Sequence, residues 1–160
     1  MPPVSSGASG EPLMSKILGV DFGERRTGVA ISDDSRVIAF PRETLSCPRV
    51  EQAAAAVARI AAAEKVAEIV VGYPLNMNST KGPRAARTDE FMAELAARTA
   101  IPLKKWDERL STKIAEAVLI EAGTRREKRR GVVDKLAAQI ILQGYLDATG
   151  GQDPAGEERP

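Results

Sequence analysis

The sequence predicts an α/β fold in which a five-stranded mixed sheet carries helices on both faces. Two observations lead to this class. Three short apolar segments joined by short polar loops come first, which predicts an antiparallel meander. Strand and helix patterns then alternate, which predicts parallel strands joined by right-handed crossovers. The length of 160 residues suits one domain, which we place at 16–148. We expect the Ser, Gly and Pro-rich segment 1–15 and the acidic tail 149–160 to be disordered.

The meander is predicted from alternating apolar stretches in the first part of the chain. The first strand runs over Ile17–Val20 and ends at Asp21, and the second covers Thr27–Ser32. A third strand over Val37–Phe40 is expected to stop at Pro41, because proline has no N–H to give to a sheet. The continuous apolar character of the first strand predicts that it lies in the centre of the sheet.

The second half of the chain changes from a period of two to a helical period. Ser46 is a candidate N-cap, since serine often closes a helix N-terminus. The Ala-rich helix that follows extends to about Lys65, and the last helix is expected from about Val132 to Ala148. Between these two, the predicted elements are a strand at Glu68–Gly72, a polar loop at Tyr73–Gly82, a helix at Pro83–Arg98, a strand at Ile101–Trp106 and a helix at Ser111–Glu121.

Composition excludes several classes of enzyme and of site. The chain has no histidine and one cysteine, which removes Ser-His-Asp triads, histidine bases and multi-cysteine zinc sites. No apolar run approaches the roughly 20 residues that span a bilayer, and the N-terminus lacks the features of a signal peptide. We therefore expect a cytosolic protein whose chemistry depends on carboxylates, lysines, hydroxyls and bound metal.

Three acids are the candidates for that chemistry. Asp21 follows an apolar strand, where a charged group is costly unless it is solvated, paired or bound to a metal. Glu108 comes just after the fifth strand, at the sheet edge where ligands of α/β proteins collect. Asp134 lies in the first turn of the last predicted helix. The small residues Ala137 and Ala138 would let that helix approach the sheet and bring Asp134 beside Asp21.

Each acid also has a simpler interpretation. Asp21 could be an exposed strand end, Glu108 could pair with Arg109, and Asp134 could offset the helix dipole. A cluster of the three would instead suit two divalent metal ions about 4 Å apart, which hydrolyse phosphodiesters without histidine. Mg²⁺ and Mn²⁺ are the natural candidates, since both prefer oxygen ligands.

Two polar segments are candidates for binding phosphate. The loop before Pro83 contains Asn76, Asn78 and Lys81 and precedes a helix N-terminus, where backbone amides favour anions. The segment Gly123–Gly131 carries five basic residues and one acid, and we expect a loop there. A solvated loop is its simplest interpretation. Its basic residues are Arg125, Arg126, Lys128, Arg129 and Arg130.

Four strings in this order resemble the YqgF/RuvX family, which is related to RuvC Holliday-junction resolvases. They are VDFGERRTGVAISD, VGYPLNMNSTKGPRA, DERLST, and Asp134 followed by AAQIIL. The match covers about Ile17 to Asp147. The family pattern usually has Leu at Tyr73 and often Asp-Gly at Asn78-Ser79.

The resemblance implies an RNase H-like fold and a metal-dependent nuclease that matures the end of pre-16S ribosomal RNA. It places the family's acidic set on Asp21, Glu108 and Asp134, which would bind Mg²⁺ or Mn²⁺. Arg109, Ser111 and Thr112 would position the glutamate or the substrate. The implied partners are nucleic acid and ribosomal particles but no membrane, and the sequence leaves monomer and homodimer open.

Three alternatives compete with the processing nuclease. Holliday-junction resolution on branched DNA is the first, and a non-catalytic ribosome-assembly factor that binds nucleic acid is the second. The third is an actin-like ATPase or sugar kinase, because Asp21-Phe22-Gly23 followed by Thr27-Gly28 also resembles their first phosphate loop. Those proteins need two such domains, whereas this chain has room for one.

Overall fold

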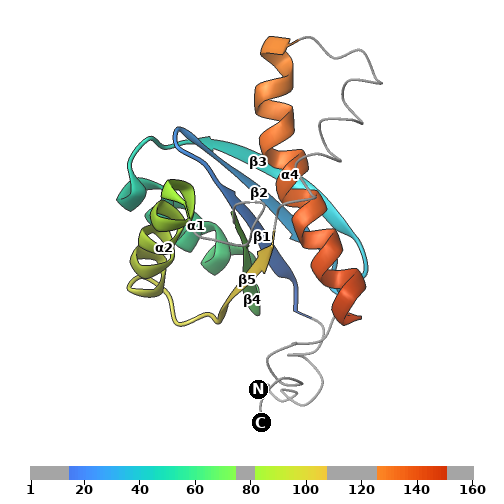
Figure 1. Cartoon of the computed structure of the whole chain (residues 1–160). Coiled ribbons are helices and arrows are strands. Elements are labelled where there is room, and N and C mark those ends of the chain that lie inside the picture. The colour runs from blue at the N-terminus through green and yellow to red at the C-terminus, as the bar shows by residue number, and fades with distance from the viewer. Residues whose placement is uncertain (1–14, 75–81, 108–125, 151–160) are drawn as a thin grey trace.

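A five-stranded mixed sheet forms the centre of the molecule in the computed structural model, which describes residues 15–74, 82–107 and 126–150 (Figure 1). The strand order is β3-β2-β1-β4-β5. β1, β2 and β3 form the predicted antiparallel meander, and β4 and β5 extend it in parallel with β1. The strands are β1 (Ile17–Phe22), β2 (Arg26–Ser32), β3 (Ala39–Ser46), β4 (Glu68–Tyr73) and β5 (Leu103–Asp107).

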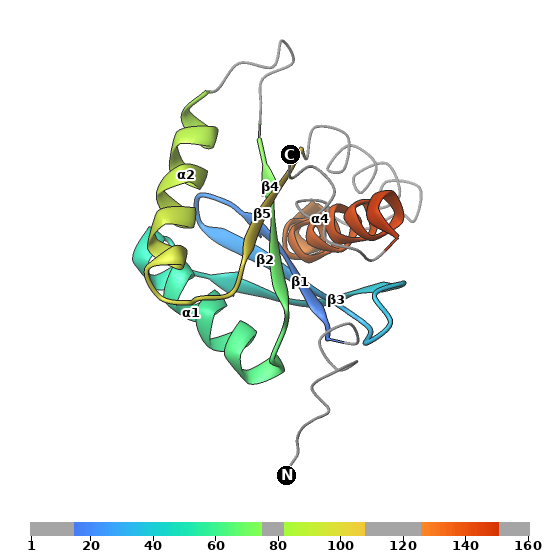
Figure 2. The same cartoon turned by 90° about the horizontal axis from the view of Figure 1, so that it is seen from below.

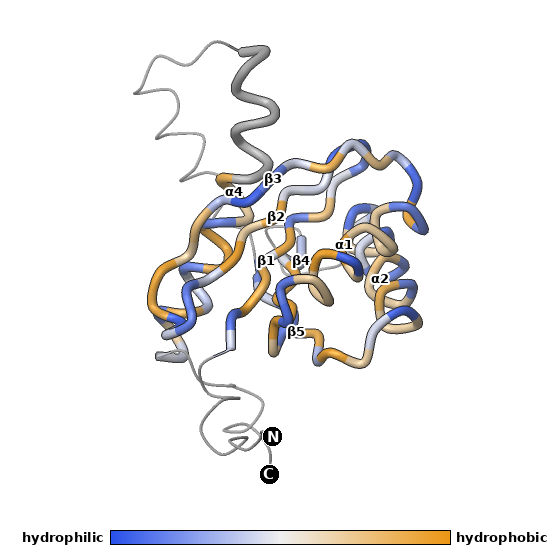
Figure 3. Tube along the Cα trace, turned by 180° about the vertical axis from the view of Figure 1, so that it is seen from behind, coloured by the Kyte–Doolittle hydropathy of each residue, from blue (hydrophilic) through white to orange (hydrophobic). Residues whose placement is uncertain are grey.

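Helices cover both faces of this sheet, as predicted. Figure 2 shows α1 (Val50–Glu64) and α2 (Pro83–Ala96) on one face and α4 (Arg126–Thr149) on the other. In Figure 3, the apolar residues of β1 and β4 are coloured orange and lie in the middle of the sheet, between the two layers of helices. Among the described residues, no helix is long and apolar enough to cross a membrane.

Alternation along β1 divides its side chains between two cores. Leu18, Val20 and Phe22 belong to the core shared with α1 and α2. Ile17 belongs to the core beneath α4, and Gly19 contacts α4 directly. Because successive side chains of a strand point to opposite faces, odd-numbered residues of β1 face α4.

The third strand differs from its prediction. β3 runs over Ala39–Ser46 and continues through Pro41, which pairs with Ala30 of β2. It is an edge strand of the sheet, and an edge strand tolerates proline because half of its N–H groups face outward. A shift in pairing register between Val29 and Ala30 accompanies the proline. The expectation that Pro41 ends the strand was therefore wrong.

The start of α1 also differs from its prediction. Ser46 is the last residue of β3 and pairs with Arg26, so it is not available to cap a helix. The helix begins at Val50, and its N-cap residue Arg49 makes no side-chain capping hydrogen bond. The strand extends past Pro41 and displaces the helix start toward the C-terminus.

Hydrogen bonds to the sheet fix the position of α4. Gln143 accepts a hydrogen bond from the Ala39 amide at 2.8 Å and donates to the Val37 carbonyl at 2.9 Å. Gln139 donates to the Ala39 carbonyl at 3.0 Å. These side chains bind backbone groups of Ala39, the first residue of β3, and of Val37 just before it, and so join α4 to an edge of the sheet.

A buried polar pair joins the C-terminal half of α4 to β4. The Tyr145 hydroxyl donates to Glu68 at 2.6 Å, and both residues are buried. The Trp106 ring meets the Tyr145 ring edge-on, with their centroids 5.7 Å apart. Glu68 also pairs with Ile17 across the sheet, so Tyr145 lies at the beginning of β1.

We expect Tyr145→Phe to lower the free energy of unfolding by about 1–3 kcal/mol, because it leaves the buried Glu68 carboxyl without its donor. Urea denaturation of wild type and variant would measure the change. Tyr73→Phe is the matched control, since its hydroxyl binds a half-exposed acid. Equal losses in both variants would contradict the role given to the buried pair.

Candidate nuclease site

Asp21 occupies the central strand and faces the layer of α4. It is the next-to-last residue of β1 and has the same parity as Ile17 and Gly19, which lie under α4. The strand extends past its predicted end because β2 pairs with Asp21 through Gly28 and with Phe22 through Thr27. The Asp21 side chain is partly exposed and lies on the α4 face of the sheet, near the carboxyl end of the central strand.

Glycines flank Asp21 in the sheet. Its partner on β2 is Gly28. On β4, the parallel pairing of Val20 with Val71 places Gly72 next in register. Glycine has no side chain, so neither of these two paired positions places a side chain directly opposite Asp21. The sequence pattern did not indicate this, because it depends on strand register.

Close packing sets the height of α4 above β1. A Cβ added to Gly19 would lie 2.7 Å from Leu142 Cβ and 3.2 Å from the Ala138 carbonyl oxygen. Ala137 and Ala138 are fully buried. The prediction that small residues let this helix approach the sheet closely is confirmed.

The direction of α4 over β1 follows from two contacts. Tyr145 lies near the beginning of β1, and Ala138 lies over Gly19. The helix therefore runs antiparallel to the strand. From Ala138 back to Asp134 is one helical turn, about 6 Å. From Gly19 forward to Asp21 is about 7 Å along the strand. The α4 turn that contains Asp134 therefore lies at the level of Asp21.

Asp134 is not in a first turn, contrary to the prediction. α4 begins at Arg126, two turns earlier, whereas the predicted start was Val132. Interaction with the helix dipole falls off within the first turn. The dipole interpretation of Asp134 therefore loses its basis, and another reason is needed for an acid at this position.

The basic run was expected to form a loop, and most of it does not. Residues Arg126 to Gly131 form the first turns of α4, so Arg126, Lys128, Arg129 and Arg130 lie on a helix. Arginine and lysine have a high helix propensity, so this basic segment can extend the apolar helix that follows it toward the N-terminus. Arg125 lies outside the described residues.

Several candidates lie outside the part of the chain that the structure describes. From the polar loop these are Asn76, Asn78 and Lys81, and after β5 they are Glu108, Arg109, Ser111 and Thr112. The predicted helix at Ser111–Glu121 lies there as well. β5 ends at Asp107, so the expectation of a strand that stops just before Glu108 in the sequence is confirmed. Among described side chains, no group of three or more potential metal ligands occurs.

Sequence reasoning missed a polar cluster at the end of β4. The Tyr73 hydroxyl donates to Asp89 of α2 at 2.9 Å. Lys105 of β5 lies 3.6 Å from the same carboxylate and 4.3 Å from the centroid of the Tyr73 ring. These contacts join two strands to α2. The one signal in the sequence was that Tyr73 stands where the family pattern usually has Leu.

Comparison with known proteins places the chain in a family. Residues 15–148 match the family model described as RuvX, Holliday junction resolvase. The chain belongs to the RuvX family. This membership favours the nuclease class over the actin-like ATPase interpretation of Asp21.

Other RuvX-family proteins are similar over nearly their whole length. One from Symbiobacterium thermophilum is 48% identical over 139 residues, which is 87% of this chain and 96% of that protein. One from Halothermothrix orenii is 47% identical over 132 residues, covering 82% of this chain and 94% of that protein. Both carry a name that proposes a pre-16S rRNA nuclease.

Solved structures agree on the fold of this RuvX-family chain. RuvC of T. thermophilus in complex with a Holliday junction substrate superposes with a TM-score of 0.55 at 13% identity, covering 86% of this chain and 97% of RuvC. The Fowlpox virus resolvase with Holliday junction DNA gives a TM-score of 0.53 at 13% identity, covering 83% and 97% of the two chains. The predicted RNase H-like α/β fold is confirmed.

Proposed function

We propose that this chain is a metal-dependent nuclease of structured nucleic acid and that it matures the end of pre-16S ribosomal RNA. The observation that carries the proposal is the close packing of α4 on β1, from which we infer an alignment of Asp21 with the α4 turn that contains Asp134. That alignment depends on the close contact between Gly19 and α4. Family membership and the names of the relatives supply the nuclease class and the RNA substrate.

The proposed catalytic acids are Asp21, Glu108 and Asp134. Asp21 is held near the carboxyl end of the central strand, where its pairing partner on β2 is Gly28. Asp134 lies four residues before Ala138 in α4, and Ala138 packs on the sheet. Two carboxylates at one level repel each other unless a cation lies between them. This donor set fits a hard divalent ion such as Mg²⁺ or Mn²⁺.

Such ions, when bound, would activate a water molecule and neutralise charge on the phosphate and on the leaving oxygen. The chain's own residues perform the remaining tasks. Asp21 and Asp134 would hold the ion at the carboxyl end of the central strand, because carboxylates repel a phosphate unless a cation lies between them. The basic residues Arg125 to Arg130 attract the nucleic-acid backbone toward these acids. Arg109, Ser111 and Thr112 are the proposed positioning residues around Glu108, and Asn76, Asn78 and Lys81 the proposed contacts from the loop.

The test is cleavage of two labelled substrates side by side, a precursor 16S ribosomal RNA and a four-way DNA junction. Each is incubated with the full chain in Mn²⁺ and in chelator. We expect cutting of the precursor RNA that requires Mn²⁺. Cutting in chelator would contradict metal dependence, and failure to cut either substrate would contradict the nuclease assignment.

Holliday-junction resolution remains the second candidate, favoured by the family description and by the likeness to RuvC. Preferential cutting of the junction in the same assay would support it over RNA processing. Binding of precursor RNA without cutting would support the third interpretation, a ribosome-assembly factor. We also propose a cytoplasmic location and association with ribosomal particles, which sedimentation of cell extract would test.

A further inference from the structure

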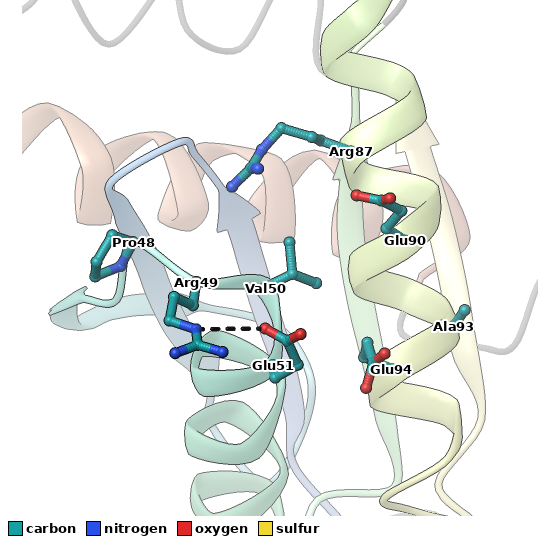
Figure 4. Close-up of a pocket in the computed structure, with 8 residues that line it drawn as sticks. All are labelled: Pro48, Arg49, Val50, Glu51, Arg87, Glu90, Ala93 and Glu94. Atoms are coloured by element: carbon teal, nitrogen blue, oxygen red, sulfur yellow. Dashed lines mark ion pairs between the residues drawn. The ribbon is translucent and has the colours of Figure 1, made fainter.

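A pocket of about 450 Å³ lies between the beginning of α1 and the side of α2 (Figure 4). It is on the face of the sheet opposite the one that Asp21 faces. Its lining residues are Pro48, Arg49, Val50 and Glu51 from the start of α1, and Arg87, Glu90, Ala93 and Glu94 from α2. Nothing in the nuclease proposal uses these residues.

Arg87 is the unusual residue of this pocket. Its guanidinium carbon lies 5.5 Å from the ring centroid of Phe22, and the Phe22 ring stacks on Phe91 with the centroids 4.6 Å apart. The Arg87 Nε atom is buried and has no hydrogen-bond partner among the described residues. A buried donor without an acceptor costs about 1–3 kcal/mol, so this arrangement needs an explanation.

Three acids line the pocket, Glu51, Glu90 and Glu94, and among the described residues none of them forms an ion pair with Arg87. Glu94 pairs with Arg98 at 2.6 Å, and Glu51 is 3.9 Å from Arg49. Figure 4 shows the Arg87 side chain extending away from Glu94 at the upper end of the pocket. The Arg87 guanidinium therefore lies over the Phe22 ring and has no ion-pair partner among the described residues.

A second unpartnered group lies close by. The Thr27 hydroxyl is fully buried and has no hydrogen-bond partner among the described atoms. Thr27 pairs with Phe22 across β1 and β2, so both unpartnered groups neighbour the same phenylalanine. Phe22 directly follows Asp21 in β1. Arg87 is thus connected to the candidate catalytic strand through a single side chain.

We propose that Arg87 binds a phosphodiester group of the nucleic-acid substrate on the α2 side of β1. Guanidinium groups form paired hydrogen bonds with phosphate oxygens, and stacking on an aromatic ring leaves their in-plane N–H groups available. A nucleic-acid strand that crosses the carboxyl end of β1 would contact Arg87 on one side and Asp21 on the other. This inference rests on the proposed nuclease function.

The test measures binding of precursor RNA by Arg87→Met and Arg87→Lys in an Asp21→Asn background, which prevents cutting during titration. Methionine keeps an unbranched side chain over Phe22 without the charge. We expect Arg87→Met to bind about tenfold more weakly, which corresponds to one lost charged contact. The slope of log affinity against log salt should fall in magnitude by about 0.7–0.9. Arg87→Lys should keep the slope.

Arg59→Met is the matched control, since Arg59 is exposed on α1 outside the pocket, and its salt slope should not change. A loss of thermal stability in Arg87→Met with an unchanged salt slope would overturn the proposal and leave a packing role. Titration with inorganic phosphate distinguishes a site for free anions from a site for nucleic acid. If Arg87→Met lost phosphate binding but bound RNA as wild type does, the proposal would also be overturned. Cleavage by the wild-type chain tests the nuclease function separately, because Arg87-dependent binding without any cutting would refute only that function.

Discussion

Asp21→Asn is expected to reduce the rate of metal-dependent cleavage by about a thousandfold or more. Replacing the carboxylate with an amide removes the charge that favours the divalent ion, and metal ions contribute several kcal/mol to phosphoryl hydrolysis, each 1.4 kcal/mol being a factor of ten. The amide has nearly the same size, so the strand pairing of Asp21 with Gly28 should persist. Single-turnover cleavage of labelled precursor RNA would measure the rate.

Asp34→Asn is the matched control, because Asp34 is an exposed acid in the hairpin between β2 and β3. Asp33 is less suitable. Its carboxylate accepts hydrogen bonds from the Ile38 and Val37 amides, which lower its pKa and tie it to the hairpin. We expect Asp34→Asn to cut at the wild-type rate. A comparable loss in both variants, or none in Asp21→Asn, would contradict the role of Asp21.

Gly19→Ala is expected to destabilise the fold and to impair cleavage together. The added methyl group would meet Leu142 Cβ at 2.7 Å and the Ala138 carbonyl at 3.2 Å, and both are attached to the backbone of α4. The helix must therefore move away from β1, at a cost of about 1–3 kcal/mol. Because the same helix carries Asp134, cleavage should fall further than the unfolded fraction explains.

Gly144→Ala is the comparison variant for Gly19→Ala, because it adds the same methyl group to α4 at a less crowded position. Its Cβ would lie 3.3 Å from the Trp106 Nε1 atom, and a side-chain ring can shift where a helix backbone cannot. We expect a smaller loss of stability and near-normal cleavage. Urea denaturation and single-turnover rates measured on the same samples would separate the two effects. Normal cleavage by Gly19→Ala would contradict the requirement for close packing of α4.

The sequence predicted the elements whose periodicity is strong. Strands β1, β2 and β4 have apolar or alternating sequences, and most residues of each are buried. The order of strands and helices also predicted the mixed sheet and its two helical layers. These features depend on local pattern and on connection rules, so they are available without tertiary information.

Features that depend on position in the sheet were not available. Pro41 is compatible with β3 only because β3 is an edge strand, and edge status is not a local property. The first turns of α4 were assigned to a loop because four basic residues dominate them, although lysine and arginine favour helices.

The candidate site also has a part that the sequence predicts and a part that depends on tertiary structure. Asp21 could be selected from the sequence because an acid after an apolar strand is costly. Its glycine neighbours and the closeness of Gly19 to α4 required strand register and helix packing. Arg87 gave no signal in the sequence, because its contact with Phe22 joins α2 to β1 across the core.

The most direct test of the central claim is calorimetric titration of the full chain with Mn²⁺. The account predicts that wild type and Asp34→Asn bind the ion, and that Asp21→Asn and Asp134→Asn each lose this binding while remaining folded by circular dichroism. Loss in both variants would support one site shared between β1 and α4. Mn²⁺ binding by Asp134→Asn equal to that of wild type would contradict the account.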